Sequence, residues 1–185
     1  MTSTFDLPAG PQVTLRDLEP DDAEAVHSFC SDPVVTQWSV WGPNTRADTQ
    51  AFLREVMAEK AAAQRSRFTF AVMVGGQVTG TAGVWVTSSA NRNGELGYTM
   101  HRNAWGKGLG TEVAGLLLEF AFGPLGLDRV EATCHPENTG SVRVLEKNGF
   151  KFEGYRKVAG RRRDSLLFAA LRPEHRPLLL PPDGG

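Results

Sequence analysis

The spacing of hydrophobic residues changes several times along the chain, and each spacing predicts a different kind of element. Alternating or continuous apolar runs predict seven strands, over 12–18, 67–74, 77–87, 95–100, 129–134, 150–158 and 164–171. Apolar residues at helical spacing predict four helices, from Asp21 or Asp22 to Phe29 and over 46–64, 111–122 and 139–148. Residues 34–43, which contain Trp38 and Trp41, show neither pattern and are expected to be irregular.

The order of these elements predicts the fold class. One strand, two helices and three strands are followed by helix, strand, helix and two more strands, which favours an α/β or α+β fold. We expect a mixed sheet of about seven strands with helices on both faces. A chain of 185 residues is long enough for one domain. We expect that domain to span 1–172, followed by a tail over 173–185 that is rich in Pro and Gly.

Composition and charge exclude several classes of protein. With 41% hydrophobic and 22% charged residues, the chain does not resemble a disordered sequence. A net charge of −1 argues against nucleic acid as a partner, because binding its backbone requires a basic excess. No apolar stretch approaches the roughly 20 residues that span a membrane, and the N-terminus lacks a signal-peptide pattern. The two cysteines and four histidines show no metal-ligand spacing. A soluble, cytoplasmic, metal-free protein is the simplest interpretation.

The strongest local motif is a glycine-rich turn between a predicted strand and a predicted helix, Trp105-Gly106-Lys107-Gly108-Leu109-Gly110-Thr111. Glycines at alternate positions let the main chain turn sharply and bring its N–H groups close to a ligand. The start of the following helix adds unpaired N–H groups and a dipole that favours anions. The motif therefore predicts a phosphate or pyrophosphate site. A tight loop that uses glycine only for its shape is the competing interpretation.

Two other phosphate-binding motifs do not fit this turn. A P-loop requires Ser or Thr directly after its lysine, and here Gly108 follows Lys107. A dinucleotide fingerprint requires GxGxxG and an acidic residue at the end of the next strand. The spacing here is GxGxG, and the next strand ends at Cys134-His135.

With these residues in place, the chain resembles the GNAT superfamily of N-acetyltransferases. The turn is similar to that family's pyrophosphate motif, in which Gly108 and Gly110 occupy the two small positions and Trp105 stands where Gln or Arg is usual. The Trp-Gly-Lys-Gly form resembles the subgroup of ribosomal-protein N-terminal (Rim-type) acetyltransferases. Segments 14–23, 95–98, 138–154 and 164–171 resemble the same subgroup in order and spacing, so the likeness covers about 12–172.

The resemblance implies a sheet that splays open between its fourth and fifth strands, with coenzyme A in the gap. Residues 106–111 would hold the pyrophosphate. The main chains of Tyr98, Thr99 and Met100 would bond the pantetheine arm, and an N–H near Met100 would polarise the thioester carbonyl. Asn138 would bond the pantetheine through its amide, although a helix-capping role is the alternative.

Two side chains are candidates for proton transfer. Glu95 could accept a proton from the attacking amine, directly or through a water. An ordinary structural or substrate-orienting glutamate is the alternative. Ser141 could donate to the leaving thiolate, with a solvent-facing serine as the alternative and Tyr155 as a weaker substitute. The basic cluster Arg161-Arg162-Arg163 indicates either a site for an acidic group or a solvated hairpin tip.

The predicted function is transfer of an acetyl group from acetyl-CoA, as cosubstrate, to a primary amine by direct attack. The absence of a useful Cys-His pair argues against a covalent enzyme intermediate. The acceptor is either a protein N-terminus or a small-molecule amine, and Trp38 and Trp41 either contact it or fill core. A non-catalytic module that binds acyl-CoA is the alternative function. The sequence leaves open whether the protein is a homodimer.

Overall fold

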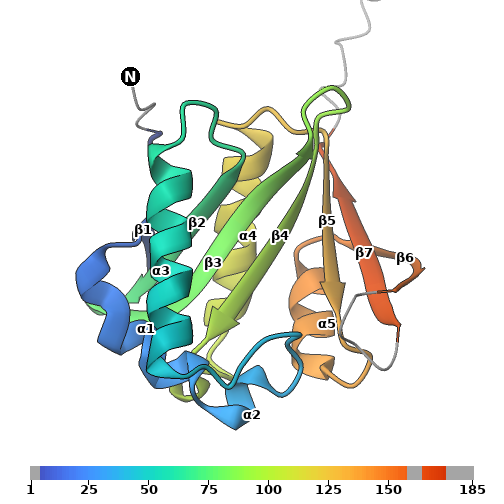
Figure 1. The fold of residues 1–185 in the computed structure, drawn as a ribbon. Coiled ribbons are helices and arrows are strands. Elements are labelled where there is room, and N and C mark those ends of the chain that lie inside the picture. The colour runs from blue at the N-terminus through green and yellow to red at the C-terminus, as the bar shows by residue number, and fades with distance from the viewer. Residues whose placement is uncertain (1–4, 158–163, 174–185) are drawn as a thin grey trace, which may run out of the picture.

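The computed structural model describes residues 5–157 and 164–173, whose strands form one seven-stranded mixed sheet in the order β1-β2-β3-β4-β5-β7-β6 (Figure 1). The strands are β1 (Val13–Asp17), β2 (Arg67–Val74), β3 (Gln77–Ser88), β4 (Asn93–Met100), β5 (Arg129–Cys134), β6 (Lys151–Arg156) and β7 (Ser165–Leu171). The helices are α1 (Ala23–Cys30), α2 (Pro33–Thr36), α3 (Arg46–Ala61), α4 (Leu109–Phe122) and α5 (Thr139–Lys147). Two short 3₁₀ turns, η1 (Pro20–Asp22) and η2 (Arg102–Ala104), complete the order.

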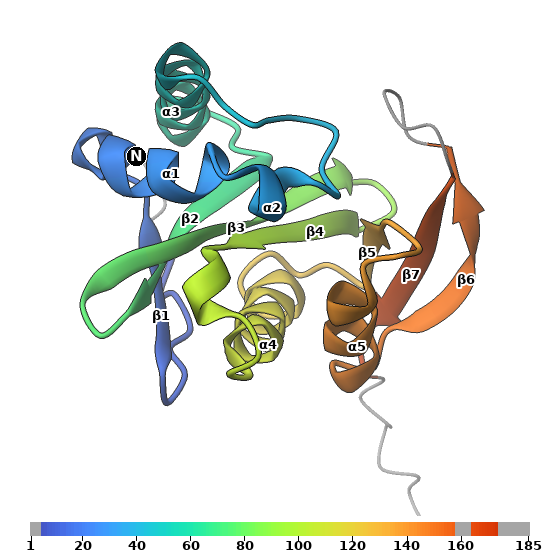
Figure 2. The same ribbon diagram turned by 90° about the horizontal axis from the view of Figure 1, so that it is seen from below.

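Helices cover both faces of the sheet, as the order of elements predicts. Seen along the sheet, α1, α2 and α3 lie on one face and α4 and α5 on the other (Figure 2). The larger core joins α4 to the sheet through residues such as Phe70, Leu96 and Val113. A smaller core, which includes Val26 and Leu53, joins α1 and α3 to the opposite face. Side chains on one face of the central sheet therefore pack into the larger core, and side chains on the other face pack into the smaller core.

The sheet is split between β4 and β5. Parallel pairing joins these strands only from Asn93↔Arg129 to Glu95↔Glu131, and no later residue of β4 pairs with β5. On its other edge β4 pairs with β3 along its full length, from Ser88↔Asn93 to Gly80↔Met100. Beyond Glu95 the two strands diverge (Figure 1). The predicted splay between the fourth and fifth strands is therefore confirmed, and it leaves one edge of β4 open.

Most of the predicted elements agree with the structure, and the bounds 67–74 and 129–134 agree to the residue. The prediction that 34–43 is wholly irregular is wrong, because α2 begins at Pro33. Proline lacks an N–H and has a helical φ, so it suits the first helical position. Asp32 caps this turn by accepting from the N–H of Val34 at 2.9 Å.

Several predictions fall wholly or partly outside the described residues. They concern the Arg161-Arg162-Arg163 cluster, the tail over 173–185, the end of the strand over 150–158 and the start of the domain over 1–172. Within the described part of the chain, no helix is both long enough and apolar enough to cross a membrane.

Candidate active site

The glycine turn leads directly into α4 and exposes its main chain. Gly108 is the N-cap of α4 with φ +81°, and Gly106 has φ +73°. No atom lies within 4 Å of the position a β-carbon would take at either residue. Glycine is needed here for its backbone conformation, and the surrounding space is open. Leu109 and Gly110 follow in the first helical turn, where N–H groups have no partner within the helix. This donor set suits a pyrophosphate.

The tryptophan of this turn is tied to the end of β4. The indole Nε1–H of Trp105 donates to the carbonyl of Met100 at 3.0 Å, and the side chain is 45% exposed. Lys107, at the tip of the turn, is exposed. A side chain that belongs to the turn therefore fixes its distance from the open edge of β4. This contact gives a structural reason for tryptophan where Gln or Arg is usual.

The main chain of β4 offers bonding groups to the split at alternate residues. The N–H of His101 donates to the carbonyl of Thr79 at 2.8 Å, on the edge of β4 that pairs with β3. Main-chain groups alternate between the two edges of a strand, so those of Thr99 also face β3. The prediction that Thr99 offers its main chain to a ligand in the split is therefore wrong. The same alternation turns the main chains of Tyr98 and Met100 toward the split.

Side chains from β4 and α5 meet across the split on the α4 face. The hydroxyl of Tyr98 lies 3.1 Å from the hydroxyl of Ser141, in the first turn of α5. Burial raises the pKa of Tyr98 to about 12, although the bond to Ser141 opposes this shift. Tyr98 therefore stays protonated at neutral pH. Asn138 is the N-cap of α5, and its Oδ1 accepts from the N–H of Ser141 at 3.1 Å. The capping interpretation of Asn138 thus holds, and its amide NH₂ stays available as a donor.

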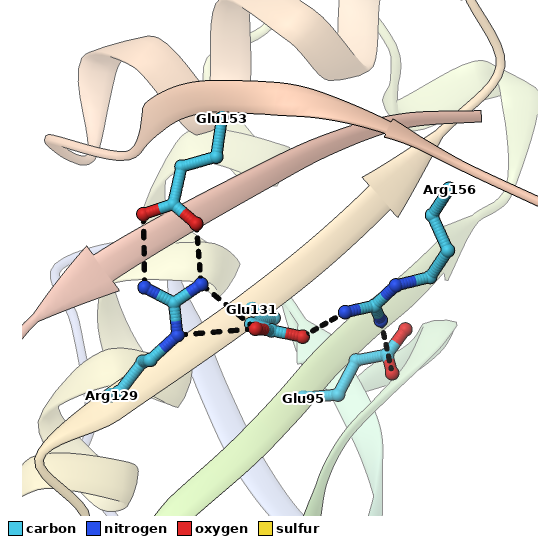
Figure 3. Close-up of polar contacts among 5 residues, drawn as sticks. All are labelled: Glu95, Arg129, Glu131, Glu153 and Arg156. Atoms are coloured by element: carbon cyan, nitrogen blue, oxygen red, sulfur yellow. Dashed lines mark hydrogen bonds and ion pairs between the residues drawn. The ribbon is translucent and has the colours of Figure 1, made fainter.

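The opposite face of the split carries a chain of alternating charges (Figure 3). Glu95 lies at the apex, at the last paired position of β4, and its Oε2 is 3.5 Å from Nη1 of Arg156. Arg156 reaches from β6 and also bonds Glu131 of β5. Arg129 joins Glu131 at 2.8 Å and Glu153 at 2.9 Å. Three carboxylates and two guanidinium groups therefore form one connected network.

The carboxylates of this network differ in pKa. Burial raises the pKa of Glu95 above its ordinary value, the charge of Arg156 opposes this, and Glu131 adds to it. For Glu131, burial alone would raise the pKa, but hydrogen bonds from Arg156 and Arg129 outweigh it and lower the pKa. Glu131 is therefore held as an ion. Glu95 is the carboxylate whose environment favours accepting a proton.

Glu95 also borders an open hollow on the α1–α3 face. Its volume is about 430 Å³, and its lining residues are Ser66, Arg67, Trp85, Val86 and Glu95. The sheet register places Arg67 beside Trp85 and Trp85 beside Glu95, so these three side chains form one row across β2, β3 and β4. The hollow therefore gives solvent-side access to the apex of the split.

The two tryptophans of 34–43, Trp38 and Trp41, differ in their exposure to solvent. Trp38 is half-buried and stacks on His135, with ring centroids 4.6 Å apart and an interplanar angle of 23°. Trp41 is 40% exposed. Neither is a fully buried core residue. Tyr155 is 68% exposed and packs against Phe152, so the structure does not bring it to Ser141.

Several of these side chains are absent from the sequence prediction. It assigns a role to the main chain of Tyr98 but none to its hydroxyl, and it assigns no role to Arg156, Glu131 or His135. Arg156 and Glu131 lie 25 positions apart, with no spacing that links them. The sequence carries a signal only for Tyr98, whose place in an alternating strand puts its side chain on the same face as Leu96 and Met100. Among the described residues, no group of three or more His, Cys, Asp or Glu side chains is placed to hold a metal ion.

Comparison with known proteins agrees with this geometry. Residues 12–151 match the family model described as an acetyltransferase (GNAT) domain. The p20 protein of Bacillus licheniformis, named an uncharacterized N-acetyltransferase, is 33% identical over 89% of this chain and 95% of its own length. A GNAT-family acetyltransferase structure from Bacillus anthracis matches with a TM-score of 0.77 and 29% identity, covering 89% of this chain and 97% of the other.

More distant relatives carry different names, two of which give an acceptor. RimJ of Mycobacterium smegmatis, solved with CoA-disulfide, matches with a TM-score of 0.75 and 28% identity over 86% of this chain and 81% of its own. The spermidine N(1)-acetyltransferase of Escherichia coli is 26% identical over 80% of this chain and 77% of its own. An aminoglycoside N(6')-acetyltransferase of Klebsiella pneumoniae is 25% identical over 77% and 75%, respectively. The matched domain, the split sheet and the glycine turn together show that this chain belongs to the GNAT family and is an acetyl-CoA-dependent N-acetyltransferase.

Proposed function

We propose that the protein acetylates a primary amine by direct attack on acetyl-CoA, with Glu95 as the base and Ser141 as the donor to the leaving sulfur. One observation carries this proposal. The open edge of β4 runs between these two groups, with the carboxylate on one face and the hydroxyl pair on the other. Both cysteines are buried, which makes acyl transfer through a cysteine unfavourable. A reaction without a covalent enzyme intermediate follows.

The chain's contribution to cosubstrate binding is mainly its backbone. The N–H groups of 106–110 would receive the pyrophosphate at the start of α4. The N–H of Thr111, which the sequence prediction includes, already donates to the carbonyl of Gly108 at 3.0 Å. The main chains of Tyr98 and Met100 would pair with the pantetheine arm in the manner of an added strand. The carbonyl of Met100 already accepts from Trp105, so its N–H is the group left to donate. The NH₂ of Asn138 would donate from the other side of the split.

The position of Glu95 decides which N–H stabilises the oxyanion. A strand rises about 3.3 Å per residue, so Met100 is about 16 Å from Glu95 along β4 and Tyr98 is about 10 Å away. A carboxylate can reach an amine directly or through one water. An amine that attacks a carbonyl at Tyr98 lies nearer to Glu95 than one that attacks a carbonyl at Met100. We therefore assign the oxyanion to the N–H of Tyr98 in place of Met100.

Glu95 would take the proton that the amine loses on attack. An aliphatic amine has a pKa of about 10, so it is mostly protonated at neutral pH. Burial raises the pKa of Glu95, which makes the carboxylate a better base than an exposed one. The charge of Arg156, whose Nη1 lies 3.5 Å from Oε2 of Glu95, opposes this shift and favours the ionised form. The proposed base therefore has a raised pKa and a cationic partner.

Ser141 would donate a hydrogen bond to the thiolate as it leaves. Its hydroxyl lies 3.1 Å from that of Tyr98, so Tyr98 can donate to Ser141 and orient the serine hydrogen toward the split. A phenol with a pKa of about 12 remains a donor across the working range of pH. Tyr98 is in this proposal a positioning residue for Ser141, and its main chain serves the oxyanion.

The acceptor class stays open between a protein N-terminus and a small molecule. The Trp-Gly-Lys-Gly turn and the likeness to RimJ support the Rim-type subgroup. The relatives named for spermidine and aminoglycosides support a small amine. We propose that residues 1–172 form the single domain that does this work, because the described strands share one sheet.

The test is an acceptor screen with acetyl-CoA that separates binding from turnover. Calorimetry measures the affinity for coenzyme A, and release of free thiol measures transfer to peptides, amino acids, polyamines and aminoglycosides. We expect binding together with amine-dependent thiol release and a product with the mass of an acetylated amine. Binding without thiol release for any amine would favour the non-catalytic acyl-CoA module. Failure to bind coenzyme A would overturn both.

A further inference from the structure

The glycine turn depends on the residues on either side of it for its position. The β-carbon positions at Gly106 and Gly108 have no atom within 4 Å, and Lys107 between them is exposed. Before the turn, the bond from the indole of Trp105 to the carbonyl of Met100 attaches it to β4. A second attachment lies just after the turn, in the first turns of α4.

This second attachment is the carboxylate of Glu112, which binds the start of β1. Its Oε1 accepts the main-chain N–H of Gln12 at 2.8 Å and that of Val13 at 2.8 Å. Its Oε2 accepts from the side-chain amide of Gln12 at 3.4 Å. The N–H of Glu112 itself donates to the carbonyl of Gly108, the N-cap of α4, at 3.1 Å. One residue therefore connects the glycine turn to the edge strand of the sheet.

The chain just before β1 is shaped to receive this carboxylate. Ala9 and Thr14 form an antiparallel bridge, and the N–H of Gly10 donates to the carbonyl of Val13 at 2.8 Å, which closes a tight turn. A β-carbon at Gly10 would lie 2.2 Å from Oε1 of Glu112, so glycine lets the main chain lie directly against the carboxylate. Val13 is fully buried, and its N–H therefore depends on a protein acceptor.

A carboxylate is well suited to this attachment. Hydrogen bonds from N–H groups to an ionised acceptor are stronger than those to a neutral one. A negative charge near the start of a helix is also stabilised by the helix dipole. Both effects hold the start of α4 in one place before a ligand arrives, and a site that is already ordered loses less entropy on binding.

We infer that Glu112 is a positioning residue for coenzyme A. By binding the start of β1, it holds the N–H groups of 106–110 in the arrangement that receives the pyrophosphate. The inference rests on the proposed use of this turn as the pyrophosphate site. Glu112 acts on the ligand through the main chain of the turn and takes no part in proton transfer. Its loss should weaken binding of ligands that contain the pyrophosphate and leave the chemical step unchanged.

The test compares two acetyl donors, of which only one carries a pyrophosphate. In Glu112→Ala, the Kd for coenzyme A and the KM for acetyl-CoA should rise about tenfold, because the turn loses its preset position. At saturating acetyl-CoA, kcat should stay within about twofold of the parent value. For S-acetylpantetheine, which lacks the pyrophosphate, kcat/KM should be the same in both proteins. Glu112→Gln keeps an oxygen acceptor and should restore the Kd to within about threefold.

Two further variants separate position from general stability. Phe5 also attaches the N-terminal segment to α4, but it does so near the far end of the helix, where its ring packs on Phe120 with centroids 5.5 Å apart. Phe5→Ala should lower the melting temperature and leave the Kd for coenzyme A unchanged. Gly10→Ala keeps Glu112 but displaces its carboxylate, so the Kd should rise in the same direction as in Glu112→Ala. This variant carries the test if Glu112→Ala does not fold.

Each outcome either supports the inference or overturns it. A lower melting temperature with an unchanged Kd in Glu112→Ala or Gly10→Ala would overturn it. An equal loss of Kd in Phe5→Ala, or an equal loss of kcat/KM with S-acetylpantetheine, would also overturn it, because neither depends on the position of the turn. Failure of the parent protein to bind coenzyme A would overturn the proposed function and the inference with it.

Discussion

The two faces of the split sheet are built from different kinds of chemical group. Toward α4 and α5, the split presents main-chain N–H groups, two hydroxyls and one amide. Toward α1–α3, it presents charged side chains in a network drawn from β4, β5 and β6 (Figure 3). The first face suits a ligand that every member of the family shares, because backbone geometry does not depend on side-chain identity. The second suits an acceptor that differs between relatives.

The comparison also explains why each face tolerates change differently. A main-chain site is damaged only when the backbone conformation is altered, which at most positions requires a change of glycine. A side-chain site is damaged by any substitution that removes a charge or leaves a partner unpaired. Substitutions on the two faces should therefore separate into effects on cosubstrate affinity and effects on turnover or its pH dependence.

The largest expected effect comes from the acceptor face. Glu95→Gln removes the proposed base but keeps the size of the side chain, and kcat should fall by about 10²- to 10⁴-fold. The affinity for coenzyme A should stay unchanged, because the carboxylate points to the opposite face from the glycine turn. Steady-state kinetics and calorimetry measure the two quantities. Glu153→Gln, at the far end of the same network, is the control and should retain activity. Full activity of Glu95→Gln from pH 6 to 9 would disprove the assignment.

The next effect tests the backbone of the cosubstrate face. Gly108→Val places a β-branched residue at φ +81°, so the turn must change shape. The affinity for coenzyme A should fall by up to about 100-fold, the scale of one to three kcal/mol of backbone strain. Gly76→Val is a matched control, since Gly76 has φ +78° and equally open surroundings in the β2–β3 hairpin. Both variants should lose similar thermal stability. An equal loss of affinity in both would mean that the turn has no special role.

A smaller effect is expected from the two hydroxyls on the cosubstrate face. Ser141→Ala should lower kcat about tenfold, because a hydrogen bond to a developing thiolate is lost. Tyr98→Phe should lower kcat less, and the double variant should resemble Ser141→Ala alone, since Tyr98 acts through Ser141. Thr139→Val removes a neighbouring hydroxyl from the same helical turn and should have no effect. Additive losses in the double variant would show that the hydroxyls act independently.

The smallest effect concerns pH. Burial raises the pKa of Glu95 and Arg156 opposes this shift, so Arg156→Gln should raise that pKa further. The active form of Glu95 is ionised. The acid limb of the pH profile of kcat should therefore move to higher pH. At pH values well above this limb, kcat should fall little. Arg156→Lys keeps the charge and should move the limb less. A limb that stays in place in Arg156→Gln would mean that Glu95 does not limit the rate on that side.

Local patterns predicted most of the fold. Apolar runs located β2 and β5 to the residue. In β5 buried and half-buried positions alternate, whereas β2 is a continuous apolar run buried at five consecutive positions. The short helix α2 was not predictable from periodicity, since its four residues make only about one helical turn and cannot show a repeated spacing. Its signals are the proline at its first position and the aspartate cap before it.

The candidate site likewise contains residues that a local motif predicts and residues that only the fold brings together. Gly106, Gly108 and the start of α4 are contiguous in the chain, so a motif in the sequence is enough to reveal them. Arg156 of β6 and Glu131 of β5 come together only because β7 pairs with both strands and holds them in one sheet. Trp38 and His135 are 97 positions apart and meet only because the segment that follows α2 packs against the end of β5.

By itself, the sequence determined the order of elements, the glycine turn and the membership in a family that binds acetyl-CoA. These properties depend on neighbours in the chain, whose backbone preferences and periodicity are local. The tertiary structure alone decided which main-chain groups of β4 face the split, which carboxylate has a pKa raised by burial, and which side chains lie on each face of the split. Those properties depend on the pairing of strands and the packing of helices, which bring together residues that no local pattern connects.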